Sequence, residues 1–128
     1  MKSIRSFLAL TLTTVSLFTV ACSSVPPVTE FPETASPSEE AKNLDRDLGA
    51  AMAAQVNVLS PNNYKEAQYA LNDAHSGIER NHKPKDILHR IAEGRAYLNR
   101  ANEVAALAHQ NMEEVVTARQ KALEAGAP

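Results

Sequence analysis

The chain has 128 residues, with 13 Lys and Arg against 15 Asp and Glu, one cysteine and no tryptophan. This length allows one small domain, and the slightly acidic balance argues against nucleic acid as a partner. A single cysteine excludes an internal disulfide.

The first 21 residues have the pattern of a secretory signal peptide. Lys2 and Arg5 supply a basic start, residues 7–20 form an apolar run interrupted only by Thr and Ser, and Ala21 is the small residue that precedes cleavage. A membrane-spanning helix needs roughly 20 apolar residues, so this run is short for that role. We expect cleavage after Ala21, which leaves 11 basic against 15 acidic residues, because Lys2 and Arg5 are removed.

Cys22 follows the expected cleavage site directly. The segment Thr19-Val20-Ala21-Cys22 resembles a bacterial lipobox, and this resemblance implies that Cys22 is lipidated and anchors the chain in a membrane. In the enterobacterial pattern, Ser23 implies the periplasmic face of the outer membrane, whereas Asp at that position would retain the protein at the inner membrane. The alternative is an ordinary secreted protein with a free cysteine.

Residues 22–35 carry the lipidated Cys22 and a Pro-rich tether. Pro26, Pro27 and Pro32 block helix formation, and such a segment favours an extended conformation with about 3.1 Å per residue. We expect the tether to reach on the order of 40 Å and to lift the folded domain off the membrane.

Residues 36–128 predict an all-α domain. Ser36-Pro37-Ser38-Glu39 forms a capping box with proline at the first helical position. Proline at 61 and 84 marks two further helix starts, and Gly126 is suited to follow the last helix. The pattern predicts three helices, over residues 37–59, 61–81 and 84–125.

The long third helix carries one heptad seam, from Ile87 to Ala122. This seam predicts antiparallel pairing, and two arrangements fit it. In the favoured one, the chain only kinks at Ser60-Pro61, so that helices 1 and 2 together cover the whole of helix 3 as a helical hairpin. In the alternative, the chain reverses at Ser60-Pro61 into a short three-helix bundle, and helix 3 projects past the bundle after about residue 104, by roughly 30 Å. This arrangement would expose an apolar stripe that needs a partner, made of Met112, Val115, Val116 and Leu123.

A second apolar flank on the third helix is a candidate partner surface. Its members are Val104, Leu107, Val116 and Leu123. A small helical domain buries a modest core, so these side chains could hold a second copy in a homo-oligomer. The alternative is a monomer in which they are half-buried.

The residues that could carry chemistry do not form a recognisable site. His75, His82 and His89 are seven residues apart, whereas zinc sites on one helix face use closer spacing. A general acid and base need an enclosing pocket, and a narrow helical hairpin offers none to the acidic pairs Asp45/Asp47 and Glu113/Glu114. We therefore expect no enzyme, no metal site and no cofactor.

One stretch supports a family resemblance. The stretch Ser60-Pro61-Asn62-Asn63-Tyr64-Lys65-Glu66-Ala67 precedes Ala70, Leu71, Ala74, a polar turn and a long Ala-rich helix. This order resembles an alanine-rich helical domain of unknown function found in small bacterial outer-membrane lipoproteins and beside peptidoglycan-binding outer-membrane modules. The resemblance covers about residues 40–120 and implies no functional residues.

These observations together favour a non-catalytic structural or adaptor lipoprotein of the bacterial cell envelope. It would present a helical rod in the periplasm to a partner protein or to peptidoglycan. The alternative is a helical accessory subunit of an envelope transport, secretion or efflux assembly.

Overall fold

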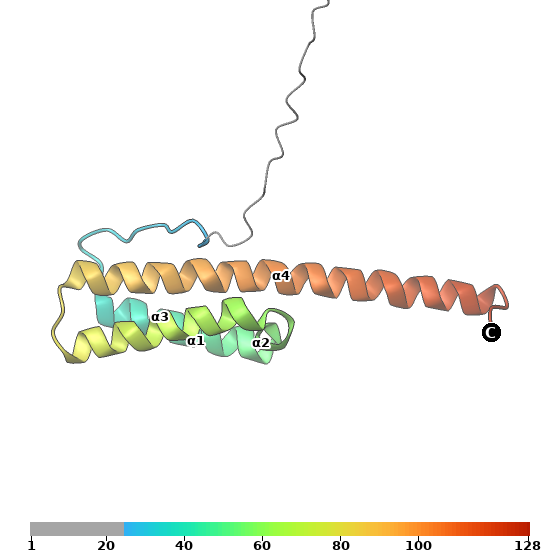
Figure 1. The fold of residues 1–128 in the computed structure, drawn as a ribbon, viewed down its shortest axis with the longest axis horizontal. Coiled ribbons are helices and arrows are strands. Elements are labelled where there is room, and N and C mark those ends of the chain that lie inside the picture. Colours follow the sequence, from blue (N-terminus) through green and yellow to red (C-terminus); the bar gives the residue numbers. More distant parts are fainter. Residues whose placement is uncertain (1–24) are drawn as a thin grey trace, which may run out of the picture.

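The computed structural model describes residues 25–128, and this part of the chain is helical without strands. Figure 1 shows a short bundle from which one long helix projects. The helices are α1 (Pro37–Ala53), α2 (Val56–Leu59), α3 (Pro61–Glu79) and α4 (Pro84–Glu124). In the described residues, none of these helices is both long and apolar enough to cross a membrane.

The helices begin where the sequence predicts. α1 starts with proline after Ser36, whose Oγ accepts a 3.5 Å hydrogen bond from the Glu39 backbone N–H. α3 and α4 also start with proline, at Pro61 and Pro84. Proline suits this position because its missing N–H would have no partner in the first turn.

Two helices end in a turn with a left-handed residue. After α3, Asn81 has φ 54°, and the His82 N–H donates to the Gly77 carbonyl at 2.9 Å. After α4, Gly126 has φ 88°, and the Ala127 N–H donates to the Ala122 carbonyl at 2.9 Å. Both turns satisfy carbonyl groups that the helix leaves free, so the expected role of Gly126 is confirmed.

The helix predicted over 37–59 breaks at Gln55, which has a left-handed φ of 62°. α1 ends before this residue, and the single turn α2 follows before Ser60 and Pro61. The domain therefore has four helices where three were predicted. The chain reverses between α1 and α3, so α1 runs parallel to α4 and antiparallel to α3 (Figure 1).

The favoured hairpin arrangement is wrong, and the short bundle with a projecting helix is the one observed. The hairpin would place α1 along the second half of α4, with Leu44 near Ala122. Instead, Leu44 is fully buried against Gly94, where a Cβ atom added to the glycine would lie 2.7 Å from Leu44 Cδ2. The reversal allows α1 to bury its apolar stripe against two helices at once rather than one.

The core lies between α1, α3 and the first half of α4. It contains small and branched residues at heptad spacing, and Leu44 and Ile91 are its largest fully buried side chains. The cluster consists of Ala41, Leu44, Leu48, Ala51, Val56, Tyr64, Ala67, Leu71, Ala74, Ile87, Ile91, Leu98, Ala101 and Ala105. Its many alanines let the helix backbones approach closely, and it ends at Ala105.

Residues 25–36 form an extended segment that lies along α4 (Figure 1), which we call the N-terminal strap. Phe31 packs against the core cluster, and the Arg95 guanidinium lies 5.0 Å from the centre of its ring. The strap covers Leu88, Ala92 and Ala96, a second buried stripe on α4. The extended backbone of the tether was predicted, but this docking was not, and it prevents the strap from acting as a free spacer.

Candidate interaction surface

The second half of α4 projects beyond the other helices (Figure 1). We call residues 106–124 the α4 overhang. From residue 109 to the end of the helix, every residue is exposed. The apolar side chains Val115 and Val116 are 68% and 67% exposed. An exposed apolar stripe of this kind is the usual mark of a binding surface.

The exposed apolar residues of the overhang lie mainly on one helix face. Met112, Val115, Val116 and Leu123 follow the spacing i, i+3, i+4, i+11, which keeps them on one side of an α-helix. We call these four residues the overhang face. Arg119 falls in the middle of it, at i+7 from Met112.

The overhang face continues the side of α4 that faces the core. Steps of three and four residues lead from Ala101 and Ala105, which are buried in the bundle, to Met112 and Val115 in the overhang. The same side of one helix is therefore buried in the bundle up to Ala105, half-buried at Ala108 and exposed from residue 109 onward.

The structure separates the four predicted partner residues. Val116 and Leu123 belong to the overhang face, and both are exposed. Val104 is half-buried at the end of the bundle. Leu107 is 59% exposed but lies five residues before Met112, away from the overhang face. The favoured hairpin arrangement assigned Met112 and Val115 to the core seam, whereas the alternative bundle predicted that they would be exposed together with Val116 and Leu123.

The polar side of the overhang carries separated charges. Glu113 and Glu114 come first, and Lys121 follows two turns later. Glu114 accepts a hydrogen bond from Gln110 at 3.3 Å, and Glu124 accepts one from Gln120 at 3.1 Å. None of the ion pairs found in residues 25–128 involves the overhang. The charges are therefore available to a partner.

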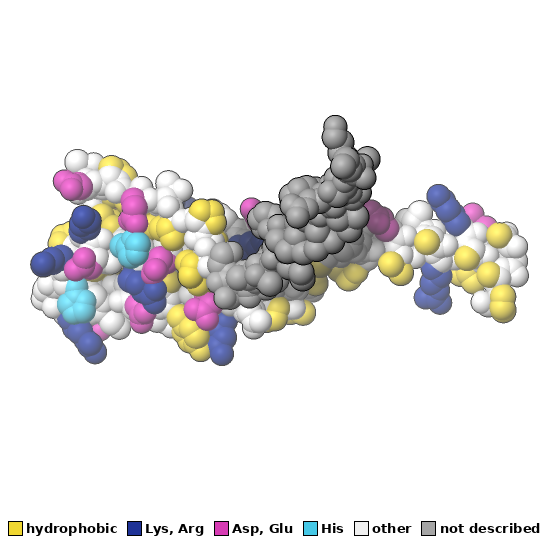
Figure 2. Space-filling view, turned by 45° about the horizontal axis from the view of Figure 1, so that its top comes forward, with side chains coloured by type: hydrophobic (Ala, Val, Ile, Leu, Met, Phe, Trp, Pro, Cys, Tyr) yellow, Lys and Arg dark blue, Asp and Glu magenta, His cyan; other side chains and the backbone are white. Residues whose placement is uncertain are grey.

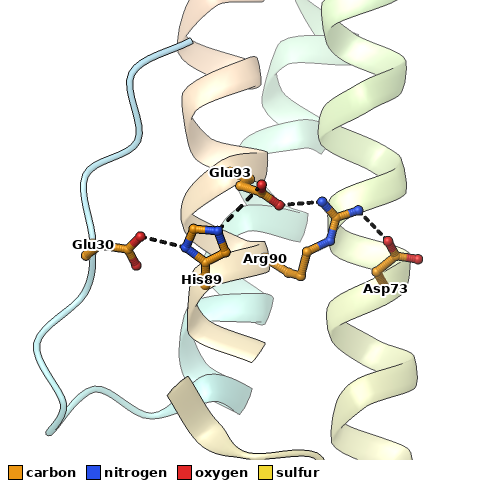
Figure 3. A network of polar contacts seen from close by, with 5 residues as sticks. All are labelled: Glu30, Asp73, His89, Arg90 and Glu93. Carbon is orange, nitrogen blue, oxygen red and sulfur yellow. Dashed lines mark hydrogen bonds and ion pairs between the residues drawn. The ribbon is translucent and has the colours of Figure 1, made fainter. Parts of the chain in front are cut away.

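The other polar feature is a network at the base of the bundle (Figure 3). His89 Nδ1 lies 2.6 Å from Glu30 Oε1 of the strap, and His89 Nε2 lies 3.6 Å from Glu93 Oε1. Arg90 joins Glu93 to Asp73 of α3 through ion pairs. These two hydrogen-bonded carboxylates raise the pKa of the Arg90 guanidinium. The network thus ties the strap, α4 and α3 together.

An open groove of about 960 Å³ lies between the strap and the start of α4. Its walls carry charges of both signs, including Glu33, Lys85 and Asp86. Figure 2 shows the same mixture of acidic, basic and histidine side chains over the bundle end of the molecule. Within residues 25–128, no three His, Cys, Asp or Glu residues are grouped so that they could hold a metal ion.

Sequence reasoning missed the strap contacts. His89 was considered only with the other helical histidines, yet its partner is Glu30, a distant residue of the tether. Two signals point to this docking. Phe31 is an isolated aromatic residue in a Pro-rich segment, and Leu88, Ala92 and Ala96 form an i, i+4, i+8 stripe beside the heptad seam.

Ala21 and Cys22, the expected cleavage and lipidation residues, lie outside the described residues. Comparison of the chain with protein-family models, curated proteins and solved structures finds no match.

Proposed function

We propose that this chain is a non-catalytic lipoprotein of the bacterial cell envelope whose task is to present the α4 overhang to a partner protein. The single observation that carries this proposal is the overhang face, which is apolar, continuous with the core-facing side of α4 and exposed in the part of the chain that the structure describes. Exposure of such an apolar surface to water is unfavourable for a monomer. A bound partner that covers the surface would explain why the chain carries it.

The apolar character of the overhang face favours a protein over peptidoglycan as the partner. A glycan strand is recognised through hydrogen bonds, whereas Met112, Val115, Val116 and Leu123 offer only dispersion and hydrophobic contact. This supports a helical accessory or docking subunit of an envelope assembly more than a peptidoglycan adaptor.

The proposed anchor is lipidated Cys22 in the outer membrane. Each buried CH₂ group contributes about 0.8 kcal/mol, and stable anchoring takes more than one acyl chain. The diacylglyceryl and N-acyl groups implied by the lipobox resemblance meet this need. The anchor and the overhang lie in different parts of the chain, so each can be tested separately.

In-cell photo-crosslinking tests the docking surface. A photoreactive residue placed at Val116 or Leu123 should give a crosslink to a protein, and the same residue at Lys121, on the polar side, should give much less. If Val116 and Leu123 give no intermolecular product while the protein is present and folded, the proposed function is wrong.

A substitution tests the anchor. Cys22→Ser should abolish fatty-acid labelling and release the protein from membranes, because the acyl chains have lost their attachment point, whereas Ser24→Ala should change neither property. Membrane fractionation and labelling with a fatty-acid analogue measure this. Unchanged membrane retention of Cys22→Ser would contradict the lipid anchor.

A further inference from the structure

We propose that the partner of the α4 overhang is the α4 overhang of a second copy of this chain, bound antiparallel. This inference rests on the proposed function, because it assumes that the overhang is a docking surface. The inference adds which molecule binds the overhang, the direction in which its helix runs and the register of the pair.

The shape of the molecule leaves room for a helix of this length. The overhang runs over residues 106–124, roughly 28 Å at 1.5 Å per residue. A helix on its face would continue the line of α1, which ends beside the middle of α4, and of α3, which begins there (Figure 1). Two overhangs related by a two-fold axis have equal lengths, so each covers the other until its tip reaches the opposite bundle.

The end of the bundle carries exposed apolar side chains near that tip. Met52 at the end of α1 and Val58 in α2 are 51% and 69% exposed. Both belong to the elements beside which the overhang begins. In the antiparallel pair, Leu123 near the end of one overhang would lie level with residue 111 of the other copy, a short distance beyond this apolar end.

Arg119 selects the antiparallel direction. A parallel, in-register pair would place Arg119 against Arg119 of the second copy within the seam. An antiparallel pair places the two arginines at different levels along the seam, where each lies opposite an apolar residue. It also opposes the two helix dipoles favourably.

The heptad positions give the register. Antiparallel coiled coils pack an a residue of one helix against a d residue of the other. If Met112 of one copy faces Ala122 of the second, then Val115 faces Arg119, and the aliphatic stem of the arginine can cover the valine while its charged head reaches water. This register centres the pair near residue 117.

Anchoring of both copies in the same membrane would allow an interface as small as this one to form. The overhang face has only four apolar side chains over about two heptads, so the pair should be weak in dilute solution. Two copies anchored in the same membrane meet at a much higher effective concentration. The association should therefore be strongest in the lipidated, membrane-bound protein.

Disulfide mapping in membranes tests the proposal on the full-length lipidated protein. Cys22 is the only native cysteine and would be consumed by lipid, so introduced cysteines are the only free thiols. Two differently tagged copies carry Met112→Cys and Ala122→Cys, respectively. We expect a mixed disulfide several-fold more abundant than either homodimer, because a disulfide needs Cα atoms roughly 4.4–6.8 Å apart.

A matched pair controls for random collision. Glu113→Cys with Lys121→Cys is also centred on residue 117 and so lies at matching levels in this register, but it is on the polar side and should give little mixed disulfide. As a second measurement, Val116→Glu should remove the species of twice the protomer mass in detergent while leaving the far-ultraviolet circular dichroism unchanged. This variant shows whether loss of the dimer is separable from loss of folding.

The outcomes separate the two proposals. A dominant disulfide between two Met112→Cys copies overturns the antiparallel direction. No disulfide above the polar-side control, together with a photo-crosslink from Val116 to a different protein, overturns the second copy as occupant but leaves the proposed function standing. The absence of both products overturns both proposals.

Discussion

Gly94 lies where α1, α3 and α4 approach most closely. A Cβ atom there would lie 2.7 Å from Leu44 Cδ2 and 3.1 Å from Ala70 Cβ. Leu44 is fully buried and cannot move into solvent. The glycine is therefore required by the packing of the bundle, although glycine normally weakens a helix interior.

This position gives a stability prediction with an internal control. Gly94→Val should lower the free energy of unfolding by about 1–3 kcal/mol, because the new side chain overpacks the core. Gly49→Val should change it by less than about 0.5 kcal/mol, since no heavy atom lies within 4 Å of a Cβ there. Urea denaturation followed by circular dichroism measures both, and equal effects would contradict this account of the core.

Tyr64 is a buried polar residue with a defined partner. Its hydroxyl donates a 3.1 Å hydrogen bond to the Leu48 carbonyl of α1. Burial, and to a smaller extent the negative charge of Asp45, raises the pKa of the Tyr64 phenol above its usual value. The folded protein therefore holds the neutral phenol more firmly than the unfolded chain does.

The raised pKa predicts a loss of stability at high pH. The stabilisation is fully present below the unfolded pKa, near pH 10, and is lost as the pH rises through the higher folded pKa, because the unfolded chain releases its proton first. Tyr64→Phe should flatten this alkaline decline and cost about 1 kcal/mol at neutral pH through the lost hydrogen bond. Denaturation midpoints at pH 7 and above pH 10 test it, and an unchanged slope in Tyr64→Phe would refute the assignment.

At the scale of the element, the N-terminal strap is held by a few contacts at its middle. Phe31 stacks with Arg95, which also pairs with Glu40 of α1 at 2.7 Å, and Glu30 pairs with His89. These contacts are partly exposed, so each stabilises by roughly 1 kcal/mol or less. The strap should therefore open locally without unfolding of the bundle.

Phe31→Ala is expected to release the strap. Amide hydrogen exchange in residues 25–36 should become several-fold faster, while exchange in α3 stays the same, because the bundle does not depend on the strap for its main core. Val25→Ala is the matched control, since Val25 is already exposed. Slow exchange in the strap of Phe31→Ala would show that other contacts hold it.

At the scale of the whole molecule, the bundle and the overhang have separate roles. The core ends at Ala105, and the overhang is a continuation of α4 that satisfies its own backbone hydrogen bonds and ends in the Gly126 turn. Such a helix is marginal alone but can extend from a helix that tertiary contacts already hold.

Truncation tests this division. A chain that stops after Gln110 should unfold within about 0.5 kcal/mol of the full chain under dilute, unlipidated conditions, because it loses exposed residues only. Urea titration measures the stability, and helical content should fall in proportion to the residues removed. A much larger loss would show that the overhang stabilises the bundle within one copy.

The amino-acid sequence by itself determined the helical class and most helix ends. Local chemistry is sufficient there, since a proline start, a serine cap or a left-handed Gly126 acts within a few residues of itself. The register of the seam was also readable, because heptad spacing is a property of one helix. The lipobox resemblance likewise rests on adjacent residues, and Cys22 remains a prediction.

Only the tertiary structure decided what covers each seam. Nothing local distinguishes a kink at Ser60-Pro61 from a reversal, because the break is placed by Gln55 and by the gain from burying Leu44 between two helices rather than one. The reversal of the chain shortens the bundle and leaves Met112 and Val115 exposed. The docking of Phe31 and Glu30 on α4 likewise depends on residues far apart in sequence, whose meeting no local pattern can specify.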